Sequence, residues 1–585
     1  MTSDLLRVAN CSGFFGDRLS AAEEMVEGGP IDVLTGDYLA ELTMAILMRQ
    51  RMKDPDAGYA RTFLTQMEEV LADCVERGIK VVANAGGLNP SGLATAVQEL
   101  AIRLGISITV ATVTGDDLMP RAGELNDKLI NMATGERLED RGLSLMTANA
   151  YLGGWGIAAA LARGADIVVT GRVSDAALVV GPAAWRFGWQ RDDWDALAGA
   201  VVAGHVIECG AQATGGNYSF FAEVPDLDRP GFPIAEIRRD GSSVITKHPG
   251  TGGLVSVGTV TAQLLYEIGP PGYLNPDVVA RIDTVELHQD GPDRVVIDGV
   301  RGEPPPPTTK VAGTALAGFR NSFTFVLAGL DIEAKAAIAE SALWAELGGK
   351  ERFAAVDVQL LRTDQENPVS NEAAFAHLKV TVMDPDRLKV GRQFSNAAVG
   401  LALANYPGFT MTAPPGRESP NVVYWPALVA QPPSFVTVDG ETVEVPPTVA
   451  RHSETVVSPE RVPGIAASAT VDDDVVMAPI GRVVGARSGD KGGDANLGVW
   501  ARSDAAYAWL DAFLTTDRLQ ELLPETVDLT VERYRLPNLR AINFVLVGFL
   551  GEGVASSSKL DPQAKSLAEY FRAKLAPIPE SLLAY

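Results

Sequence analysis

Several features of common protein classes are missing from this 585-residue sequence. It has only three cysteines, Cys11, Cys74 and Cys209, and no CxxC pair, so a disulfide framework and a structural zinc site are not expected. The five histidines form no HxH or HExxH pattern, which argues against a histidine metal site. No stretch approaches the roughly 18 uninterrupted apolar residues of a membrane span, and the first residues lack the basic segment of a secretory signal. We expect a cytoplasmic protein with no membrane partner.

Positive charge is scarce as well. The chain has 49 basic and 74 acidic residues, which gives a net charge of −25. From Asp474 onward there are 12 basic and 14 acidic residues, a net of −2, so −23 belongs to the first 473 residues. Such an excess repels a phosphate backbone unless a local basic patch offsets it. Nucleic acid is therefore not an expected partner.

The first 180 residues repeat a Val- and Ile-rich run, a glycine-containing polar loop and a segment with helical periodicity. This is the pattern of βα units, and near-continuous apolar strands are typical of a parallel sheet covered on both faces. The clearest helix is predicted over 59–77. We predict a doubly wound, mainly parallel α/β sheet with strands at Leu6–Asn10, Ile31–Leu34, Lys80–Asn84, Ser107–Ala111 and Ile167–Thr170.

The pattern loosens after about residue 200 and resumes near the C-terminus. Strand-like runs, among them Val255–Leu265, surround a predicted helix at Ile332–Leu347. A polar, small-residue segment then suits a linker, and four strands and two helices follow it. We predict a large α/β domain over 1–450, with a possible split into subdomains near 200–290, a linker over 451–474 and an α+β domain over 475–585.

The predicted strands end in five loops that pair glycine with small polar or charged residues. In an open α/β sheet, ligands bind outside the carboxyl ends of the strands, so these loops are the first candidates for a site. Any one of them could equally be a turn or a helix cap. The loops begin at Asn10-Cys11-Ser12-Gly13, Thr35-Gly36-Asp37, Asn84-Ala85-Gly86-Gly87-Leu88-Asn89, Thr112-Val113-Thr114-Gly115-Asp116 and Thr170-Gly171-Arg172-Val173-Ser174-Asp175.

Asp37 and Asp175 are the acid or base candidates, because a partly desolvated carboxylate can be tuned towards neutral pH. Arg172 would clamp a carboxylate or phosphate, or else pair with Asp175 on the surface. A divalent cation held by Asp37, Asp116 and Asp175 is the lesser alternative. We predict no firm cofactor.

The Gly86-Gly87 loop would form an anion nest with Asn84 and Asn89. The competing interpretation is a tight turn with Ser91 capping the next helix. His205 lies four residues before Cys209, a spacing that serves a nucleophile only on a helix. A buried, unreactive cysteine is the commoner outcome.

The densest motif lies in the C-terminal unit. Its glycines would let backbone amides approach an anion, with two cations beside them, and these exceed what a hairpin turn requires. We predict that this loop binds an anion and packs against the glycine loops of the large domain. The candidate binding residues are Arg487, Ser488, Gly489, Asp490, Lys491 and Asn496.

With these segments in view, the sequence resembles the acyclic terpene utilisation protein AtuA family. The resemblance covers about 1–450 and a C-terminal ferredoxin-like domain over about 475–585. It is carried by Val8-Ala9-Asn10-Cys11-Ser12-Gly13-Phe14-Phe15-Gly16-Asp17-Arg18, Leu34-Thr35-Gly36-Asp37-Tyr38-Leu39-Ala40-Glu41, Asn84-Ala85-Gly86-Gly87-Leu88-Asn89-Pro90 and Arg487-Ser488-Gly489-Asp490-Lys491-Gly492-Gly493-Asp494-Ala495-Asn496.

The resemblance implies a role beside acyl-CoA carboxylases and enoyl-CoA hydratases in the breakdown of citronellol-type or other branched acids. It provides no mechanism. Our first hypothesis is a lyase-type enzyme that adds or removes water, or cleaves a carbon–carbon bond, next to the thioester of an acyl-CoA. The alternative is a non-catalytic acyl-CoA-binding or scaffolding partner of the carboxylase or hydratase. We also expect a homo-oligomer.

Overall fold

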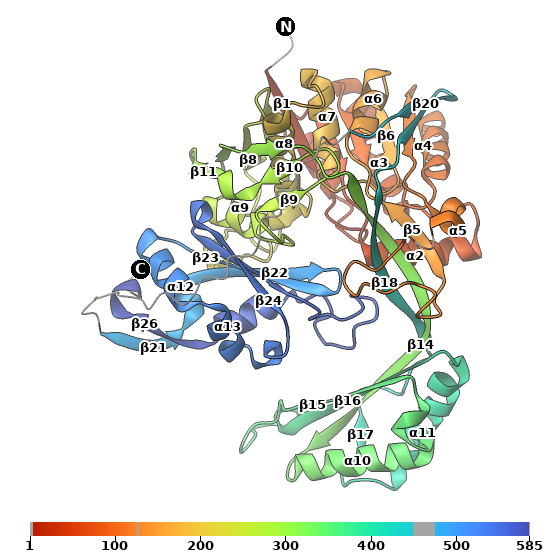
Figure 1. Cartoon of the computed structure of the whole chain (residues 1–585), viewed down its shortest axis with the longest axis vertical. Coiled ribbons are helices and arrows are strands. Elements are labelled where there is room, and N and C mark those ends of the chain that lie inside the picture. Colours follow the sequence, from red (N-terminus) through yellow and green to blue (C-terminus); the bar gives the residue numbers. More distant parts are fainter. Residues whose placement is uncertain (1–3, 126–127, 449–473, 584–585) are drawn as a thin grey trace.

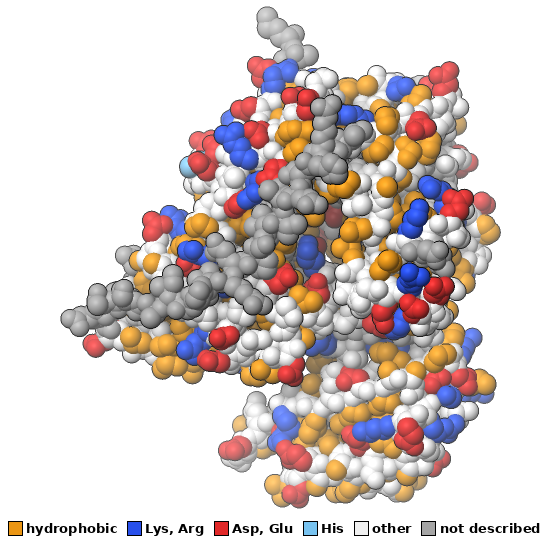
Figure 2. Space-filling view, viewed as in Figure 1, with side chains coloured by type: hydrophobic (Ala, Val, Ile, Leu, Met, Phe, Trp, Pro, Cys, Tyr) orange, Lys and Arg blue, Asp and Glu red, His pale blue; other side chains and the backbone are white. Residues whose placement is uncertain are grey.

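The computed structural model describes residues 4–125, 128–448 and 474–583 (Figure 1). In this part of the chain, no helix combines the length and the apolar character needed to cross a bilayer. The face seen in Figure 2 mixes acidic and basic side chains, without a large patch of one sign. The predicted linker over 451–474 lies almost entirely outside the described residues, and the predicted domain boundaries stay predictions.

Within the described residues, the main sheet has eleven strands in the order β11-β12-β8-β7-β1-β2-β3-β6-β4-β19-β20. Its centre is parallel and corresponds to the five predicted strands. These are β1 (Leu5–Asn10), β2 (Val33–Gly36), β3 (Lys80–Ala83), β6 (Ile167–Thr170) and β4 (Val110–Thr114).

Antiparallel strands extend the sheet on both sides, so the prediction of a mainly parallel sheet is wrong for the sheet as a whole, which is mixed. Strands from later in the chain pair with the two outer strands of the parallel centre, β1 and β4. The added strands are β7 (Pro233–Arg238), β8 (Ser243–Lys247), β11 (Glu286–Gln289), β12 (Val295–Asp298), β19 (Ser434–Val438) and β20 (Glu441–Val445).

Helices cover both faces of the parallel centre, because alternate strand residues point to opposite sides. Val81 and Ala83 join one core, and Val82 joins the other. The first core includes α1 (Ala21–Glu27), α3 (Arg61–Arg77) and α4 (Pro90–Leu104); the second includes α6 (Trp155–Ala162), α7 (Ala177–Phe187) and α8 (Trp194–Ile207). Helix α3 confirms the helix predicted over 59–77, and Gly78 ends it with a left-handed φ of +69°.

A long strand, β14 (Thr308–Ala328), leaves this body and carries a separate lobe, seen at the bottom of Figure 1. Its first half pairs with β5 (Leu145–Ala150) and β18 (Ser419–Ala430), and its second half pairs with β16 (Phe375–Asp384). The lobe has its own core, with the predicted helix α10 (Ile332–Leu347), α11 (Phe394–Gly400) and β15 (Ala355–Leu361).

The predicted strand over Val255–Leu265 is wrong, since Val257–Leu264 forms helix α9. The run is rich in β-branched residues, which favours strand. However, the Ser256 hydroxyl and the Thr259 side chain form a reciprocal capping box that starts a helix. A local cap here outweighs residue composition.

The C-terminal unit contains an antiparallel sheet in the order β22-β23-β25-β24. The predicted glycine-rich loop is mostly strand, because β22 continues to Lys491 and only Gly492 and Gly493 make the turn. Beside the sheet lie three helices and a two-stranded ribbon. The elements are β22 (Val484–Lys491), β23 (Asp494–Ala501), β24 (Val531–Leu536), β25 (Ala541–Leu546), α12 (Asp504–Phe513), α13 (Thr516–Leu522), α14 (Leu567–Arg572), β21 (Val475–Pro479) and β26 (Leu575–Pro579).

The β22–β23 hairpin docks on the segment that follows α9. A Cβ on Gly489 would lie 2.3 Å from the Tyr266 ring, and one on Gly498 would lie 2.5 Å from Leu265. Only glycine, which has no Cβ, lets the hairpin backbone come this close to Tyr266 and Leu265. Asn496, fully buried, donates to the Leu265 carbonyl and accepts from the Glu267 amide at 2.7 and 2.9 Å.

Asn496→Ala is expected to lower the free energy of unfolding by about 3 kcal/mol, because it leaves buried donors and acceptors without partners. Urea titration of the full chain measures the change. The exposed Asn371→Ala is the matched control and should change it by less than about 0.5 kcal/mol. An equally small loss in Asn496→Ala would show that this docking contributes little.

Candidate functional site

The five glycine loops lie at one edge of the main sheet, as predicted, because all five preceding strands run parallel. The loops also contact one another. The Asp37 amide donates to the Ser12 carbonyl at 2.9 Å. The Arg172 amide donates to the Asp116 carboxylate at 2.8 Å. The sequence prediction of one shared edge is confirmed.

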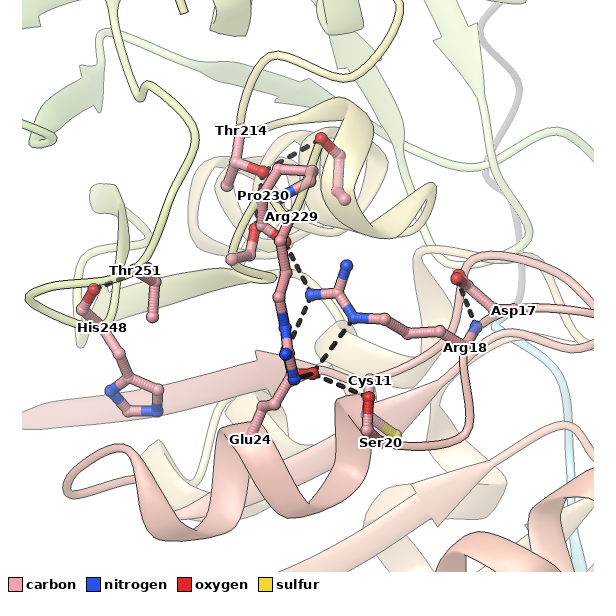
Figure 3. A network of polar contacts seen from close by, with 12 residues as sticks. Cys11, Asp17, Arg18, Ser20, Glu24, Thr214, Arg229, Pro230, His248 and Thr251 are labelled. Atoms are coloured by element: carbon pink, nitrogen blue, oxygen red, sulfur yellow. Dashed lines mark hydrogen bonds and ion pairs between the residues drawn. The ribbon is translucent and has the colours of Figure 1, made fainter. Parts of the chain in front are cut away.

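The loop after β1 is held by a polar network rather than left open for a ligand (Figure 3). Arg18 bonds the Glu24 carboxylate at 2.7 Å and the Pro230 carbonyl at 2.6 Å. The Ser12 hydroxyl donates to the Phe14 carbonyl, and the Gly13 amide donates to Asp17. The predicted ligand-binding role of Ser12 and Gly13 has no support in this arrangement.

The Gly86-Gly87 loop is a tight turn and not an anion nest. The amides of Gly87, Leu88 and Asn89 donate to the carbonyls of Asn84, Gly58 and Gly86, respectively. Asn89, rather than Ser91, caps α4 by accepting from the Gly92 amide at 2.9 Å. Amides used in this way cannot bind an anion without breaking the turn, so this prediction is corrected.

Asp37 follows Gly36 and is buried beside Asn84. Its Oδ1 accepts from Asn84 Nδ2 at 2.6 Å and from the Leu39 amide at 3.1 Å. Burial raises the pKa of Asp37 well above its usual range, and the Asp175 carboxylate adds to that rise. The side chain is therefore suited to carry a proton near neutral pH.

Arg172 lies between these carboxylates. Its guanidinium donates to Asp175 at 2.7 Å and to the Leu39 carbonyl at 3.1 Å. It also stacks over the Tyr151 ring at 4.2 Å. The alternative pairing with Asp175 is thus present, but it is not on the surface, because Arg172 is 4% exposed. The structure thus brings together the three predicted catalytic residues Asp37, Arg172 and Asp175.

Asp116 has a different environment. Its Oδ2 accepts from the Arg172 amide and from Asn149 Nδ2, each at 2.8 Å, and burial raises its pKa to about 6. Among the residues that the structure describes, the grouping with metal-ligand proximity is the largely exposed set Glu286, His288 and Asp298. The proposed cation ligands Asp37, Asp116 and Asp175 do not converge in that way.

His205 and Glu208 add a buried pair behind the loops. His205 lies in the last turn of α8, and its Nδ1 is 3.2 Å from Glu208 Oε1 rather than next to Cys209. Burial lowers the pKa of His205 to about 4. Burial, followed by Asp175, raises the pKa of Glu208 well above its usual range, and burial also raises the pKa of Cys209. A reactive thiolate at Cys209 is therefore disfavoured.

The β22–β23 hairpin lies against this region, as predicted, through contacts across a wide sequence gap. Lys491 Nζ donates to the Glu267 carbonyl at 3.1 Å, and Arg487 bonds Gln212 and lies over the Tyr266 ring. Ser488 donates to the Ala564 carbonyl. Each of these side chains makes a contact within the protein, and their predicted role in binding an anion stays a prediction.

Asp490, which belongs to the same hairpin, lines a pocket. The pocket contains about 340 Å³ of space, counting its open mouth. It is lined by three ionisable residues, Glu41, Tyr424 and Asp490, by apolar Leu42, Ala45, Val422, Val554 and Ala555, and by Thr314 and Gly492. The large domain, strands β14 and β18 and the C-terminal unit therefore all contribute to its wall.

The two carboxyl groups of this pocket differ in charge state. Burial, with the nearby Glu267 and Glu41, raises the pKa of Asp490 to about 9. Burial also opposes ionisation of Glu41, but the charges of Lys310 and Arg172 hold the pKa of Glu41 below its ordinary value. Lys310 Nζ lies 3.9 Å from Glu41 Oε1. At neutral pH these shifts favour an ionised Glu41 and a protonated Asp490.

Asp490→Asn is expected to stabilise the protein increasingly as pH rises. The folded wild type keeps a proton on Asp490 that the unfolded chain releases, so its stability falls between pH 5 and pH 8, whereas asparagine has no proton to lose. The difference should grow by up to about 4 kcal/mol, at about 1.4 kcal/mol per pH unit. Urea titrations at pH 5, 6.5 and 8 measure it, with the exposed Asp528→Asn as control. A difference that is constant with pH would show that Asp490 is ionised.

Sequence reasoning missed most of the groups around this pocket. Glu41 ends one of the runs that carry the family resemblance and was not selected as a candidate. Tyr151, Glu267, Lys310 and Tyr424 lie in segments without a recognisable motif. Lys310 lies on β14 and Tyr424 on β18, and only the pairing of β14 with β5 and β18 brings these two residues to the loops of the sheet.

Comparisons with known proteins agree with the sequence resemblance. A model of the acyclic terpene utilisation family protein AtuA matches residues 6–438, which is well over half of the 585 residues, and one of the AtuA ferredoxin-like domain matches residues 478–574. A comparison with curated proteins finds no match. The chain belongs to the AtuA family, which is involved in acyclic terpene utilisation, and it contains the family's ferredoxin-like domain.

Proposed function

We propose that this protein is an enzyme that performs acid–base chemistry next to the thioester of a branched acyl-CoA. The reaction is the addition or removal of water, or the cleavage of a carbon–carbon bond. The observation that carries the proposal is the pocket in which Glu41 and Asp490 face the same space with their pKa values displaced in opposite directions. Such divergent carboxyl pairs are typical of acid–base catalysis.

The lining of the pocket fits an apolar acyl chain with a polar reacting end. Leu42, Val422 and Val554 supply apolar surface, while Glu41 and Asp490 lie at the same wall. In the proposed reaction, the Glu41 carboxylate takes the proton from the α-carbon. The protonated Asp490 donates to the oxygen that becomes negative or to the leaving group.

Asp37, Asp175 and Arg172 are not among the residues that line this pocket. We assign them a positioning role: Arg172 helps to keep Glu41 ionised through its charge, and Asp175 holds Arg172. We therefore assign the direct acid–base role, predicted for Asp37 and Asp175, to Glu41 and Asp490.

The alternative is an acyl-CoA-binding or scaffolding partner of the pathway's carboxylase or hydratase. Binding alone requires the apolar wall but no pair of carboxyl groups with opposed charge states. The buried acid Asp490, which is costly to place at a protein interface, favours catalysis.

Incubation with a citronellyl-type acyl-CoA in D₂O separates these functions. A catalyst is expected to exchange the α-protons of the acyl group, as followed by NMR or mass spectrometry, and to show a thermal shift with the ester. A thermal shift without exchange would indicate the binding role, and neither effect with a series of branched acyl-CoA esters would refute both.

A further inference from the structure

A second pocket shares no lining residue with the pocket of Glu41 and Asp490. It contains about 310 Å³ of space, again counting its mouth. Its walls come from the segment after β5, the β9–β10 turn (between Gly272–Leu274 and Val279–Arg281) and the connections on either side of β19 and β20. The lining includes Tyr151, Trp155, Asp277, Gln431, Ser434 and three prolines, Pro432, Pro446 and Pro447.

Asp277 supplies a buried hydrogen-bond acceptor to this pocket. The residue is 2% exposed, and its Oδ2 accepts from the Gly154 amide at 2.7 Å. Its Oδ1 lies against Gly153, where a Cβ would come within 2.1 Å, and forms no hydrogen bond with any described residue. Burial raises the pKa of Asp277 to about 6. One carboxylate oxygen is therefore available to a donor on a ligand.

Trp155, which also lines this pocket, has a donor without a partner among the described residues. Its indole Nε1 has no acceptor within the described part of the protein, although the atom is buried. A buried N–H without a partner is costly and calls for an explanation. Asp277 and Trp155 therefore offer a ligand one acceptor and one donor, in a space bounded by flat proline and aromatic side chains.

The surrounding charges select the class of ligand. Arg191 stacks over the Trp155 ring at 4.8 Å, and Arg172 stacks over the Tyr151 ring at 4.2 Å. Because resident cations already occupy these aromatic faces, an ammonium ligand is disfavoured. A flat, uncharged heterocycle that carries an amine fits the pocket, and Arg191 beside it can bind an attached phosphate.

We propose that this pocket binds the adenine base of a nucleotide, with its exocyclic amine donating to Asp277, a ring nitrogen accepting from Trp155 and a phosphate near Arg191. Free adenine nucleotides and coenzyme A present the same chemistry. The proposal does not depend on the acid–base function of the first pocket, which deuterium exchange tests separately.

Calorimetric titration of the full chain with AMP, IMP, CoA and pantetheine tests the site. IMP replaces the exocyclic amine of AMP by a carbonyl, and pantetheine lacks the adenosine phosphate of CoA. We expect AMP to bind at least about tenfold more tightly than IMP, or CoA at least about tenfold more tightly than pantetheine, which is the contribution of one charged hydrogen bond. Selectivity for AMP identifies a free nucleotide as a ligand, and selectivity only for CoA identifies the coenzyme.

The variant Asp277→Asn sharpens the test. An asparagine that still accepts from the Gly154 amide presents its NH₂ group to the pocket, so the preference should reverse in favour of IMP. The exposed Asp290→Asn should keep the wild-type preference. Equal affinity of the wild type for AMP and IMP together with equal affinity for CoA and pantetheine, or no binding of any of the four, would overturn the proposal. The comparison of the four ligands uses the wild type alone, so it does not depend on whether Asp277→Asn folds.

Discussion

Glu41→Gln is expected to reduce α-proton exchange on a branched acyl-CoA by about 10²- to 10⁴-fold, the usual contribution of a positioned general base. Glutamine keeps the length of the side chain and its place at the first residue of α2 (Glu41–Lys53). It cannot accept a proton from carbon. The rate should fall while the thermal shift caused by the ester remains, because the apolar wall is intact.

Asp37→Asn is the matched comparison, since it tests the base that sequence analysis predicted. The side-chain carbonyl introduced by this substitution can still accept from Asn84 and from the Leu39 amide, and we expect exchange to fall by less than about tenfold. A loss in Asp37→Asn as large as in Glu41→Gln, or normal exchange in Glu41→Gln, would contradict the assignment of Glu41 as the base.

The parallel centre of the fold was predictable because each of its strands is a short apolar run next to a glycine loop, a signal contained within a few residues. The flanking strands were not, because their partners are distant: β7 pairs with β1 across more than 220 residues, and β19 joins β4 across more than 320. Such register depends on the assembled edge of a sheet and not on local periodicity.

The candidate site likewise has a part that short sequence segments predict and a part that depends on distant contacts. Asp37, Arg172 and Asp175 were found because strand ends converge by a general rule. The pocket was missed because Tyr424 reaches it on strand β18, which pairs with β14, and Asp490 reaches it on a hairpin from another unit. Glycine density in that hairpin was read as anion binding, whereas Gly489 and Gly498 serve its close approach to the large domain.

Arg172→Ala is expected to lower the free energy of unfolding by about 3 to 5 kcal/mol at pH 7, the usual effect of removing one partner of a buried ion pair. The substitution leaves Asp175 without its 2.7 Å donor, and Asp37 without the charge that partly offsets its burial. It also removes the stacking on Tyr151. Urea titration of wild type and variant measures the loss.

The loss should depend on pH in a defined direction. Arg172 lowers the pKa of Asp37 against burial and the charge of Asp175, so the variant raises that pKa further in the folded protein. A carboxyl group whose folded pKa is raised loses stability as pH rises towards that pKa. Arg172 also holds the pKa of Glu41 below its ordinary value, and the variant loses this effect. The deficit of Arg172→Ala should therefore be smallest at low pH and should grow as pH rises through the range in which Glu41 is ionised in the folded wild type but still carries a proton in the folded variant. Arg172→Lys, which retains the charge, should show a smaller and flatter deficit. A deficit that is the same at every pH would mean that Arg172 acts through packing on Tyr151 and not through its charge.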